Sequence, residues 1–227
     1  MPNRVTPPMR LLLVLLLIAV AFPAAAQTAY PIKADDGAIV ANHRIAPETI
    51  GDIERLPGVV VAGNPKGDVT LAEFYDLNCP YCRKASGDMA ALLQEDKKLR
   101  LLLVPFPVLG IESIMAARVE LAVTRLGTPE QAWQFHRKIF SGRGVVEGTR
   151  ALAVARELGF TDDKLIATAN DDDVTDTMKA HVRLGNALKL QATPAYVIGD
   201  VAVLGHPGRK ALRGVIEAMR RCNKVVC

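Results

Sequence analysis

The chain has 227 residues, of which 50% are hydrophobic, and its 28 basic and 24 acidic side chains leave a formal charge of +4. So small a charge, with no block of basic residues, argues against nucleic acid as a partner. The length suits one domain with a substantial hydrophobic core.

The first 26 residues have the three parts of a secretory signal peptide. They begin with two arginines and no acidic residue, continue as an apolar run from Leu11 to Phe22, and end in Ala24-Ala25-Ala26. The run is shorter than the roughly 20 residues of a membrane span, although an uncleaved anchor is the alternative. We expect cleavage after Ala26 and a periplasmic mature chain, which keeps a formal charge of +2 because the leader holds two basic and no acidic residues.

Residues 27–58 are polar and show little periodicity. A short helix could begin near Pro47, in the stretch APETIGDIERL. The remainder is expected to be an extended N-terminal arm, either a loose leader or a segment for oligomerisation, and the sequence does not decide between them.

The next segment has a strand, a helix and a second strand. VTLAEFYDL, from Val69 to Leu77, follows the turn residues NPKGD and predicts a buried strand. From Pro80 to about Glu95, apolar residues recur at three and four positions, which predicts a helix with proline at its first position. LRLLLVPF, beginning at Leu99, predicts the second strand.

From Ile111 to about Leu190 the sequence predicts several helices and no strand. Gly127 is typical of a helix C-cap, and Thr128-Pro129 of the start of the next helix. TPAYVIGDVAVLG then predicts a hairpin that turns at Gly199-Asp200, and GRKALRGVIEAMRR predicts a final helix.

Two of the four cysteines, Cys79 and Cys82, lie in DLNCPYC, where the first predicted strand leads into a helix. This spacing occurs in redox dithiols, in half of a zinc site and in short structural disulfides. The order of strand, helix, strand, helical block, strand, strand and helix around it favours a thioredoxin-like α/β fold.

On these motifs the chain resembles the DsbA family of exported thiol–disulfide oxidoreductases. The resemblance extends from about residue 59 to residue 221 and rests on EFYDLNCPYC, on VPFPVLG followed by helices, and on TPAYVIG before the hairpin. It implies an α/β thioredoxin-like domain (59–110 and 191–221) with an all-helical insertion (111–190) and a tail (222–227). The sequence departs from the family in its Pro-Tyr dipeptide, where the best-known oxidases have Pro-His, in its long arm and in its second cysteine pair.

The expected N-cap position of Cys79 favours a thiolate, because backbone N–H groups and the helix dipole stabilise an anion there. We therefore expect Cys79 to be the nucleophile and Cys82 the resolving thiol. Arg83 and Lys84 add positive charge nearby, or form a solvated face. The resemblance implies that Glu73 lies beneath Cys82 and moves its proton; a surface acid at a sheet edge is the alternative.

The resemblance also implies that the Thr193-Pro194 bond is cis and faces the cysteines, with an ordinary trans proline as the alternative. The backbone of Thr193 would then pair with an extended substrate segment. Pro80 and Tyr81, between the two cysteines, would contact the same substrate.

Cys222 and Cys227 are expected to form a local structural disulfide that fixes the tail. A second redox pair, unpaired thiols and a bond between chains are the alternatives. The histidines form no cluster in the sequence, so no metal site is predicted, although the Cys79–Cys82 dithiol could still bind copper(I).

The sequence thus predicts a periplasmic enzyme that exchanges disulfides with unfolded or reduced exported proteins and needs no bound cofactor. A redox partner, for which a membrane protein is one candidate, resets the dithiol. An oxidase is favoured over an isomerase, a reductase remains open, and so does the oligomeric state. The competing hypothesis is a periplasmic copper carrier that uses the same dithiol.

Overall fold

The computed structural model describes residues 28–227. The expected signal peptide therefore lies outside the described residues. Within 28–227, no helix is both long enough and apolar enough to cross a membrane.

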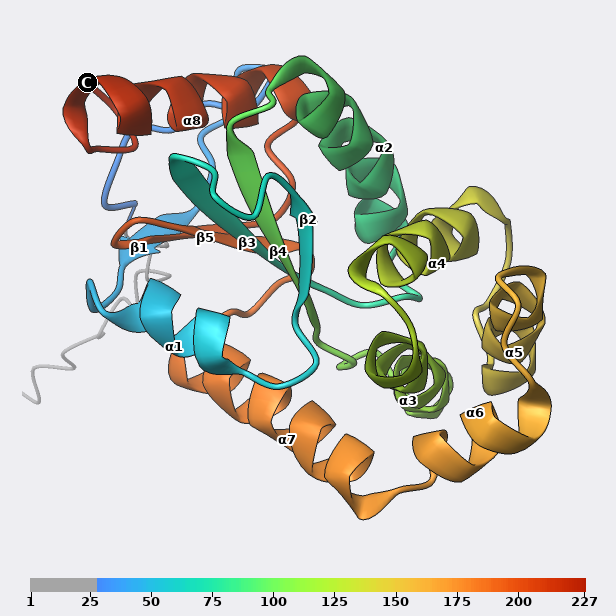
Figure 1. Cartoon of the computed structure of the whole chain (residues 1–227). Coiled ribbons are helices and arrows are strands. Elements are labelled where there is room, and N and C mark those ends of the chain that lie inside the picture. Colours follow the sequence, from blue (N-terminus) through green and yellow to red (C-terminus); the bar gives the residue numbers. More distant parts are fainter. Residues whose placement is uncertain (1–27) are drawn as a thin grey trace, which may run out of the picture.

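A mixed six-stranded sheet forms the centre of the molecule (Figure 1). Its strands are β1 (Asn42–Arg44), β2 (Val60–Gly63), β3 (Val69–Tyr75), β4 (Leu99–Pro105), β5 (Ala195–Ile198) and β6 (Val201–Leu204). Their order is β1-β6-β5-β3-β4-β2, with β3 and β4 parallel and all other neighbours antiparallel. The predicted strands at β3 and β4 and the predicted β5–β6 hairpin are confirmed.

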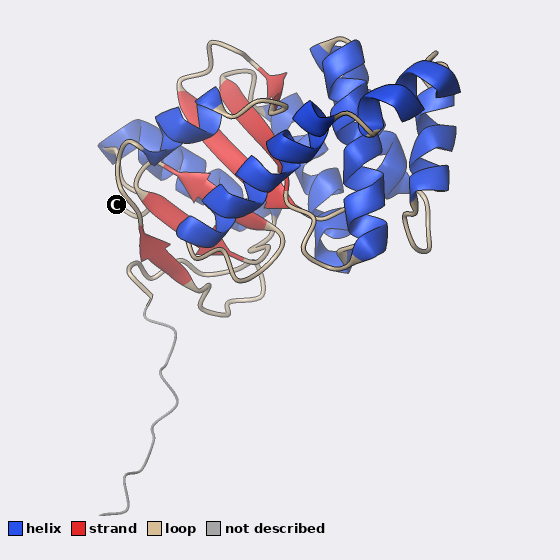
Figure 2. Ribbon diagram, turned by 90° about the horizontal axis from the view of Figure 1, so that it is seen from below, coloured by secondary structure: helices blue, strands red, loops and turns tan. Residues whose placement is uncertain are grey.

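The described residues also form eight helices. They are α1 (Thr49–Arg55), α2 (Pro80–Glu95), α3 (Ile111–Leu126), α4 (Pro129–Ser141), α5 (Gly148–Glu157), α6 (Asp162–Ala169), α7 (Asp172–Ala187) and α8 (Arg209–Cys222). Helices α2 and α8 cover one face of the sheet and α1 and α7 the other, while α3 to α6 gather beside it (Figures 1 and 2).

The central strand β3 is buried on both faces, which explains its continuous apolar sequence. Leu71 and Tyr75 join the core beneath α2 and α8, whereas Ala72 and Phe74 join the core beneath α1 and α7. Side chains alternate along a strand. Glu73 therefore shares the face of Leu71 and Tyr75 and points toward α2.

The segment expected to be an arm folds against its own sheet. β1 pairs with β6, and Ile32 and Val40 are buried in the core. Asp35 accepts two backbone N–H groups at the start of α8, from Lys210 and Ala211. A loose leader is therefore wrong for residues 28–58, and the helix expected near Pro47 is α1. A role of this segment in oligomerisation stays a prediction.

Residues 111–190 form helices and no strand, as their periodicity indicates. Thr128 and Gln131 form a capping box at the start of α4, with bonds of 3.2 and 3.0 Å. A Cβ at Gly127 would lie 2.7 Å from the Phe160 ring and 2.9 Å from the Val123 carbonyl oxygen, so only glycine fits between α3 and α4.

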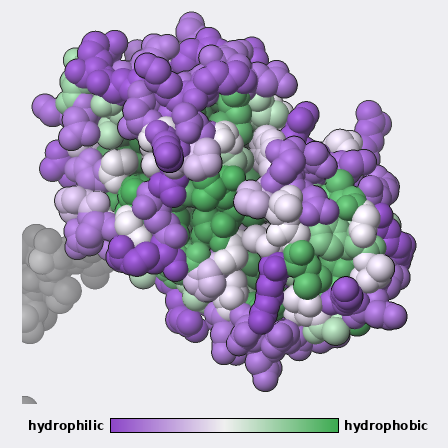
Figure 3. All heavy atoms as spheres, viewed as in Figure 1, coloured by the Kyte–Doolittle hydropathy of each residue, from purple (hydrophilic) through white to green (hydrophobic). Residues whose placement is uncertain are grey.

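The face of the molecule shown in Figure 3 is mainly hydrophilic. Hydrophobic colour gathers in the middle of this face and toward the helical insertion on the right, between polar rims.

Candidate active site

The two cysteines of the CxxC motif lie where β3 leads into α2. Cys79 is the N-cap of α2, and Pro80 is the first helical residue, where its missing N–H costs nothing. Both cysteines are free thiols and are buried, with exposed fractions of 4% and 0%.

Cys79 is surrounded by hydrogen-bond donors. As a thiol it donates to the carbonyl oxygen of Thr193 at 3.0 Å. As a thiolate it accepts from the Cys82 thiol, from the Thr193 side chain and from the backbone N–H groups of Cys82 and Tyr81. These donors, the Cys82 thiol first, outweigh the opposing effect of burial and lower the pKa of Cys79 to about 6. At neutral pH this sulfur is therefore mostly a thiolate.

Cys82 has the opposite character. Burial raises the pKa of its thiol far above the ordinary range, and the hydrogen bond to Cys79 and the negative charge of Glu73 raise it further. The two sulfurs of one motif thus differ in role: one is stable as an anion, whereas the other holds its proton.

Glu73 lies in β3 on the face that points toward α2. Its side chain is 1% exposed, and its Oε2 atom has no hydrogen-bond partner among the described residues. Burial first, and then the charge of Cys79, raise the pKa of Glu73 to about 8. The carboxyl group is therefore mostly protonated at neutral pH, and the alternative of a surface acid at a sheet edge is wrong.

The Thr193-Pro194 peptide bond is cis and lies opposite the cysteines. The Pro194 carbonyl oxygen accepts the N–H of Gly205 at 2.9 Å, which ties this turn to the end of β6.

A hollow of about 690 Å³ opens at the reactive cysteine. Tyr81, which is 68% exposed, borders it together with Cys79 and Pro80. The rest of its lining comes from the loop after β4, from the end of α7 and the turn that leads to Thr193, and from Gly205 and His206 after β6. The sequence suggested four residues for substrate contact: Pro80, Tyr81, Thr193 and Pro194. The first three border this hollow together with Cys79, whereas Pro194 is not part of its lining.

Comparison with known proteins places the chain in a family. Residues 56–218 match the family described as Thioredoxin, which is well over half of the chain. The chain belongs to this thioredoxin family. A thioredoxin-like oxidoreductase from Silicibacter pomeroyi DSS-3 is 32% identical, with a TM-score of 0.70 over 78% of this chain and 99% of that one.

Two further solved structures share the thioredoxin fold. A periplasmic thioredoxin-like protein from Salmonella enterica serovar Typhimurium is 24% identical, with a TM-score of 0.67 over 77% of this chain and 97% of that one. The thiol-disulfide exchange protein alpha-DsbA2 from Wolbachia pipientis is 23% identical, with a TM-score of 0.68 over 76% and 95%. The thioredoxin-like α/β fold and the resemblance to DsbA-like proteins are therefore confirmed, and the protein is an oxidoreductase of the thioredoxin family.

A curated relative, the Na(+)/H(+) antiporter NhaA of Herminiimonas arsenicoxydans, is 24% identical over 164 residues. The match covers 71% of this chain but only 25% of that protein. The thioredoxin-family chain therefore spans about a quarter of the length of this relative.

Sequence reasoning missed a set of polar side chains that hold the active-site loop of this thioredoxin-family protein. Asp76 is 1% exposed and accepts the N–H groups of Val108 and Leu109 at 2.8 and 2.9 Å. It also accepts the Ser113 hydroxyl at 2.7 Å. The side chain of Asn78 bonds the backbone of Val146 in the loop before α5. An aspartate and an asparagine two residues apart, just after a strand, are the available signal. Their distant partners are visible only in the fold.

A second missed group joins α2 to the hairpin. His206 bonds Asp88 of α2 through one ring nitrogen and the Tyr196 hydroxyl through the other, each at 2.8 Å. Tyr196 is the register partner of Glu73 across β3 and β5. This chain of contacts fixes the turn that carries Thr193 relative to the helix that carries Cys82.

The positive charge expected beside Cys79 is directed elsewhere. The Arg83 guanidinium donates to the carbonyl oxygens of Gly142 and Gly144 after α4. Arg83 is not among the groups that lower the pKa of Cys79. Its interactions shape the loop of the insertion that faces the active site.

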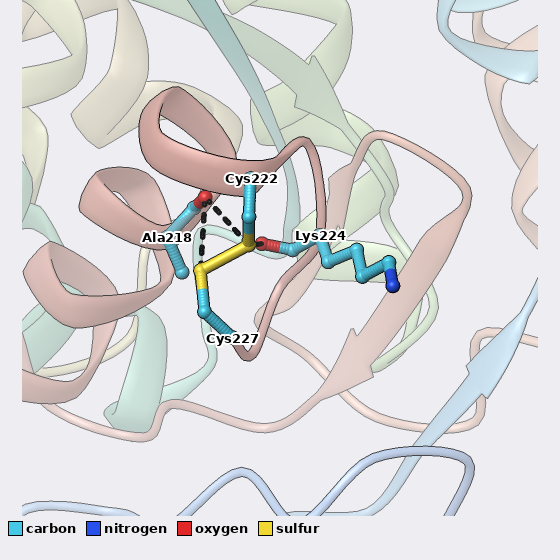
Figure 4. The surroundings of a disulfide bond; sticks show 4 residues. All are labelled: Ala218, Cys222, Lys224 and Cys227. Carbon is cyan, nitrogen blue, oxygen red and sulfur yellow. Dashed lines mark hydrogen bonds between the residues drawn. A yellow bond between two sulfur atoms is a disulfide. The ribbon is translucent and has the colours of Figure 1, made fainter.

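Cys222 and Cys227 form a disulfide at the end of α8 (Figure 4). The Ala218 carbonyl oxygen lies 3.3 Å from the Cys222 sulfur and 3.6 Å from the Cys227 sulfur. Because a disulfide carries no S–H, these are contacts rather than hydrogen bonds. The arrangement fixes the tail, where Val225 is buried.

Within residues 28–227, no three or more His, Cys, Asp or Glu side chains gather as a metal site would require. Cys79 and Cys82 form a pair of thiols without a third such ligand in this part of the chain.

Proposed function

We propose that this oxidoreductase is periplasmic and passes a Cys79–Cys82 disulfide to exported polypeptides, as an oxidase rather than an isomerase. The contrast between the two thiols carries the proposal: the pKa of Cys79 falls to about 6, while that of Cys82 rises. A thiol of lower pKa is the better leaving group, and a stabilised reduced form makes the pair more oxidising.

The reaction begins when a substrate thiolate attacks the Cys79 sulfur of the oxidised pair. A mixed disulfide forms, the Cys79–Cys82 bond breaks, and Cys82 leaves with the electron pair. A second substrate thiolate then attacks the first substrate sulfur, and Cys79 leaves as a thiolate. The substrate loses two electrons and gains a disulfide, while the enzyme gains the same two electrons as a dithiol.

Cys82 needs a proton when it leaves, because its raised pKa disfavours a thiolate. Glu73, with a pKa of about 8, holds a proton at neutral pH and lies in the strand beneath α2. We assign Glu73 as the group that gives this proton in oxidation and takes it back when Cys82 acts as a nucleophile.

The hollow beside Cys79 supports a polypeptide substrate. The Thr193 carbonyl oxygen already lies 3.0 Å from the reactive sulfur, so a substrate strand that pairs with this backbone would bring its cysteine to Cys79. Pairing through backbone groups gives affinity with little sequence preference. Tyr81, exposed at the rim, adds apolar contact area.

Location and oligomeric state follow from separate observations. The first 26 residues have the pattern of a signal peptide, a structural relative from Salmonella is described as periplasmic, and the tail disulfide suits an oxidising compartment. Residues 28–58 pack on their own sheet, which supports an enzyme without an arm for oligomerisation, and hence an oxidase. Continued turnover needs a redox partner that re-oxidises the dithiol.

The proposal is tested by mixing the oxidised mature protein with a reduced, unfolded polypeptide that contains two cysteines. After an acid quench, the disulfide is expected on the substrate and two thiols on the protein. An equilibrium that leaves the disulfide on the protein would favour a reductase. Tight stoichiometric copper(I) binding that blocks exchange would favour the metal carrier.

A further inference from the structure

Large apolar side chains are exposed on the helical insertion next to the active site. The described residues include nine exposed large apolar side chains, and three of them, Tyr81, Val108 and Leu109, border the hollow at Cys79. Five others belong to the insertion, and four of these border further hollows: Ile111, Met115, Val145 and Ile166, with exposed fractions of 61, 48, 60 and 44%. Exposed apolar side chains that lie close together on one surface are a feature of interaction sites.

These side chains border two further hollows that continue the one at Cys79. A hollow of about 590 Å³ is bordered by Val145 and shares Pro80 and Leu109 with the hollow at the cysteine. A third, of about 390 Å³, lies between α3, α5 and α6 and is bordered by Ile111, Met115 and Ile166. The second and third hollows share Glu112 and Glu147. We call these two hollows the insertion track.

The first part of the track is fastened to the active-site loop. Asn78, one residue before the nucleophile, bonds the N–H and carbonyl of Val146 at 2.7 and 3.0 Å. Arg83, one turn into α2, donates to the carbonyls of Gly142 and Gly144. The loop that carries Val145 is therefore held in place before any partner binds.

We propose that the insertion track binds an extended apolar segment of the substrate polypeptide. This proposal rests on the proposed function. A substrate cysteine bonded to Cys79 continues as a chain in two directions. The backbone of Thr193 and its hollow take one direction, and the track, which begins at Pro80 and Leu109, takes the other.

The chemistry of the track fits such a segment. The third hollow is lined mainly by apolar side chains, so binding there comes from non-directional burial that tolerates many sequences. The rim of the track has charges of both signs, with Glu112 and Glu147 against Arg83 and Arg118. A rim of mixed charge around an apolar centre is typical of a protein-binding surface and favours no strongly charged partner.

The test compares a small dithiol, which is too short to contact the track from Cys79, with a polypeptide that is long enough to do so. The mature protein, whose dithiol is re-oxidised in each cycle by excess glutathione disulfide, is assayed with dithiothreitol and with an unfolded polypeptide whose two cysteines have apolar residues on both sides, and the rate without protein is subtracted. The track variant is Met115→Ser with Ile166→Ser. The matched control is Ile39→Ser with Leu126→Ser, two exposed apolar side chains that border none of the three hollows.

For the track variant we expect the KM for the polypeptide to rise about tenfold, since two partly exposed apolar side chains lose their contact with it. Its kcat, and its rate with dithiothreitol, should stay within about twofold of the parent, as should every rate of the control. An unchanged KM in the track variant, or an equal rise in the control, would overturn the proposal. So would a change confined to re-oxidation, which would assign the track to the redox partner.

Photo-crosslinking gives an independent measurement. A photoreactive side chain is placed at residue 115 or at residue 126 in a Cys82→Ala protein. Its Cys79 thiolate attacks a polypeptide whose cysteine carries an aromatic disulfide, the aromatic thiolate leaves, and the mixed disulfide with the polypeptide persists because Cys82 is absent. Crosslinks to the substrate are expected from residue 115 and not from 126, and the reverse pattern overturns the proposal. If the parent protein transfers its disulfide to dithiothreitol but to no polypeptide, the proposed function itself fails, and the track proposal with it.

Discussion

The two cysteine pairs of this protein lie at opposite ends of helices. Cys79 precedes α2, with Cys82 in its first turn, whereas Cys222 is the last residue of α8 and bonds Cys227 in the tail. At the start of α2, backbone N–H groups point at the Cys79 sulfur. At the end of α8, the carbonyl oxygen of Ala218 faces both sulfurs of the disulfide.

This difference explains why one pair can react and the other serves structure. N–H groups and the positive end of a helix dipole stabilise a thiolate, whereas carbonyl oxygens and the negative end destabilise it. A sulfur that is poor as a thiolate is also a poor leaving group, so the pair at the end of α8 resists exchange. We infer that its position, more than its spacing, keeps it from exchanging.

Of the changes predicted here, removing the reactive sulfur should have the largest effect, and this effect is on the rate of disulfide transfer. Cys79→Ser is expected to lower the rate of disulfide transfer to a polypeptide by more than about a thousandfold, because a serine hydroxyl forms no disulfide. The double variant Cys222→Ala with Cys227→Ala should keep the parent rate within about twofold, because its sulfurs take no part. Transfer rates are measured by quenched flow. Loss of transfer in the double variant would mean that the second pair relays electrons.

The second-largest effect on the transfer rate is expected from the buried acid Glu73. Glu73→Gln removes the proton donor for Cys82 but keeps the shape of the side chain, and we expect transfer at pH 7 to slow about a hundredfold. The mixed disulfide and its decay are followed on non-reducing gels. Glu120→Gln, a buried acid on α3 that bonds the Tyr75 hydroxyl, is the matched control and should change the rate little. Equal slowing in both variants would reduce the role of Glu73 to packing.

Removing the tail disulfide should lower the stability of the fold and leave the transfer rate unchanged. Closing a loop of six residues restricts the unfolded chain only modestly, so Cys222→Ala with Cys227→Ala should lower the free energy of unfolding by about 2 kcal/mol. Urea denaturation of the active-site-oxidised form measures this change. No loss of stability would remove the structural role assigned to the second pair.

The smallest expected effect is the pH dependence of stability. The Cys79 pKa of about 6 lies below its unfolded value of 9.0, so the reduced fold gains stability as pH rises above 6 and loses it as pH falls through 6. The gain between pH 5 and 7 is about 1.4 kcal/mol. It is measured as the difference between the reduced and oxidised proteins.

The stability of the oxidised protein has to be subtracted from that of the reduced protein because Glu73 also titrates in this pH range. Its pKa is raised from 4.5 to about 8, so its contribution falls as pH rises between these values, opposite in sign to that of Cys79. Burial, the main cause, is present in both redox forms, and most of this contribution cancels. If the free energy of unfolding changed with pH in the same way in the reduced and oxidised forms, the Cys79 thiolate would not be stabilised.

Most of the fold could be predicted from local patterns. The helix α2, from Pro80 to Glu95, and the capping box at Thr128 follow from residue spacing and from side-chain chemistry within one turn. Strands β1 and β2 could not be predicted, because β1 has three polar residues and β2 only four residues, too few for periodicity to be informative. Both acquire their structure by pairing with strands distant in the sequence.

The candidate site, too, has residues that local motifs predict and residues that only the fold reveals. Cys79, Cys82 and Thr193-Pro194 stand in short motifs that can be recognised in the sequence. Besides two nearer contacts, Tyr196 with His206 and Asn78 with Asp76, the partners of Asp76, Asn78 and His206 lie between 32 and 118 residues away, and nothing local predicts them. Likewise, the sequence placed Glu73 in a strand, but only the packing of α2 over that strand explains its raised pKa.

The most direct test of the account is a pH titration of the thiolate absorbance of the reduced protein. The Cys222→Ala, Cys227→Ala variant is used, so that only the active-site sulfurs can titrate. We predict one thiolate with a midpoint at about pH 6, since the raised pKa of Cys82 keeps its thiol protonated. Adding Cys82→Ala should move the midpoint upward, because the strongest donor to Cys79 is lost. A first midpoint at or above about 8, the range of an ordinary cysteine, would contradict the stabilised thiolate and the oxidase assignment that rests on it.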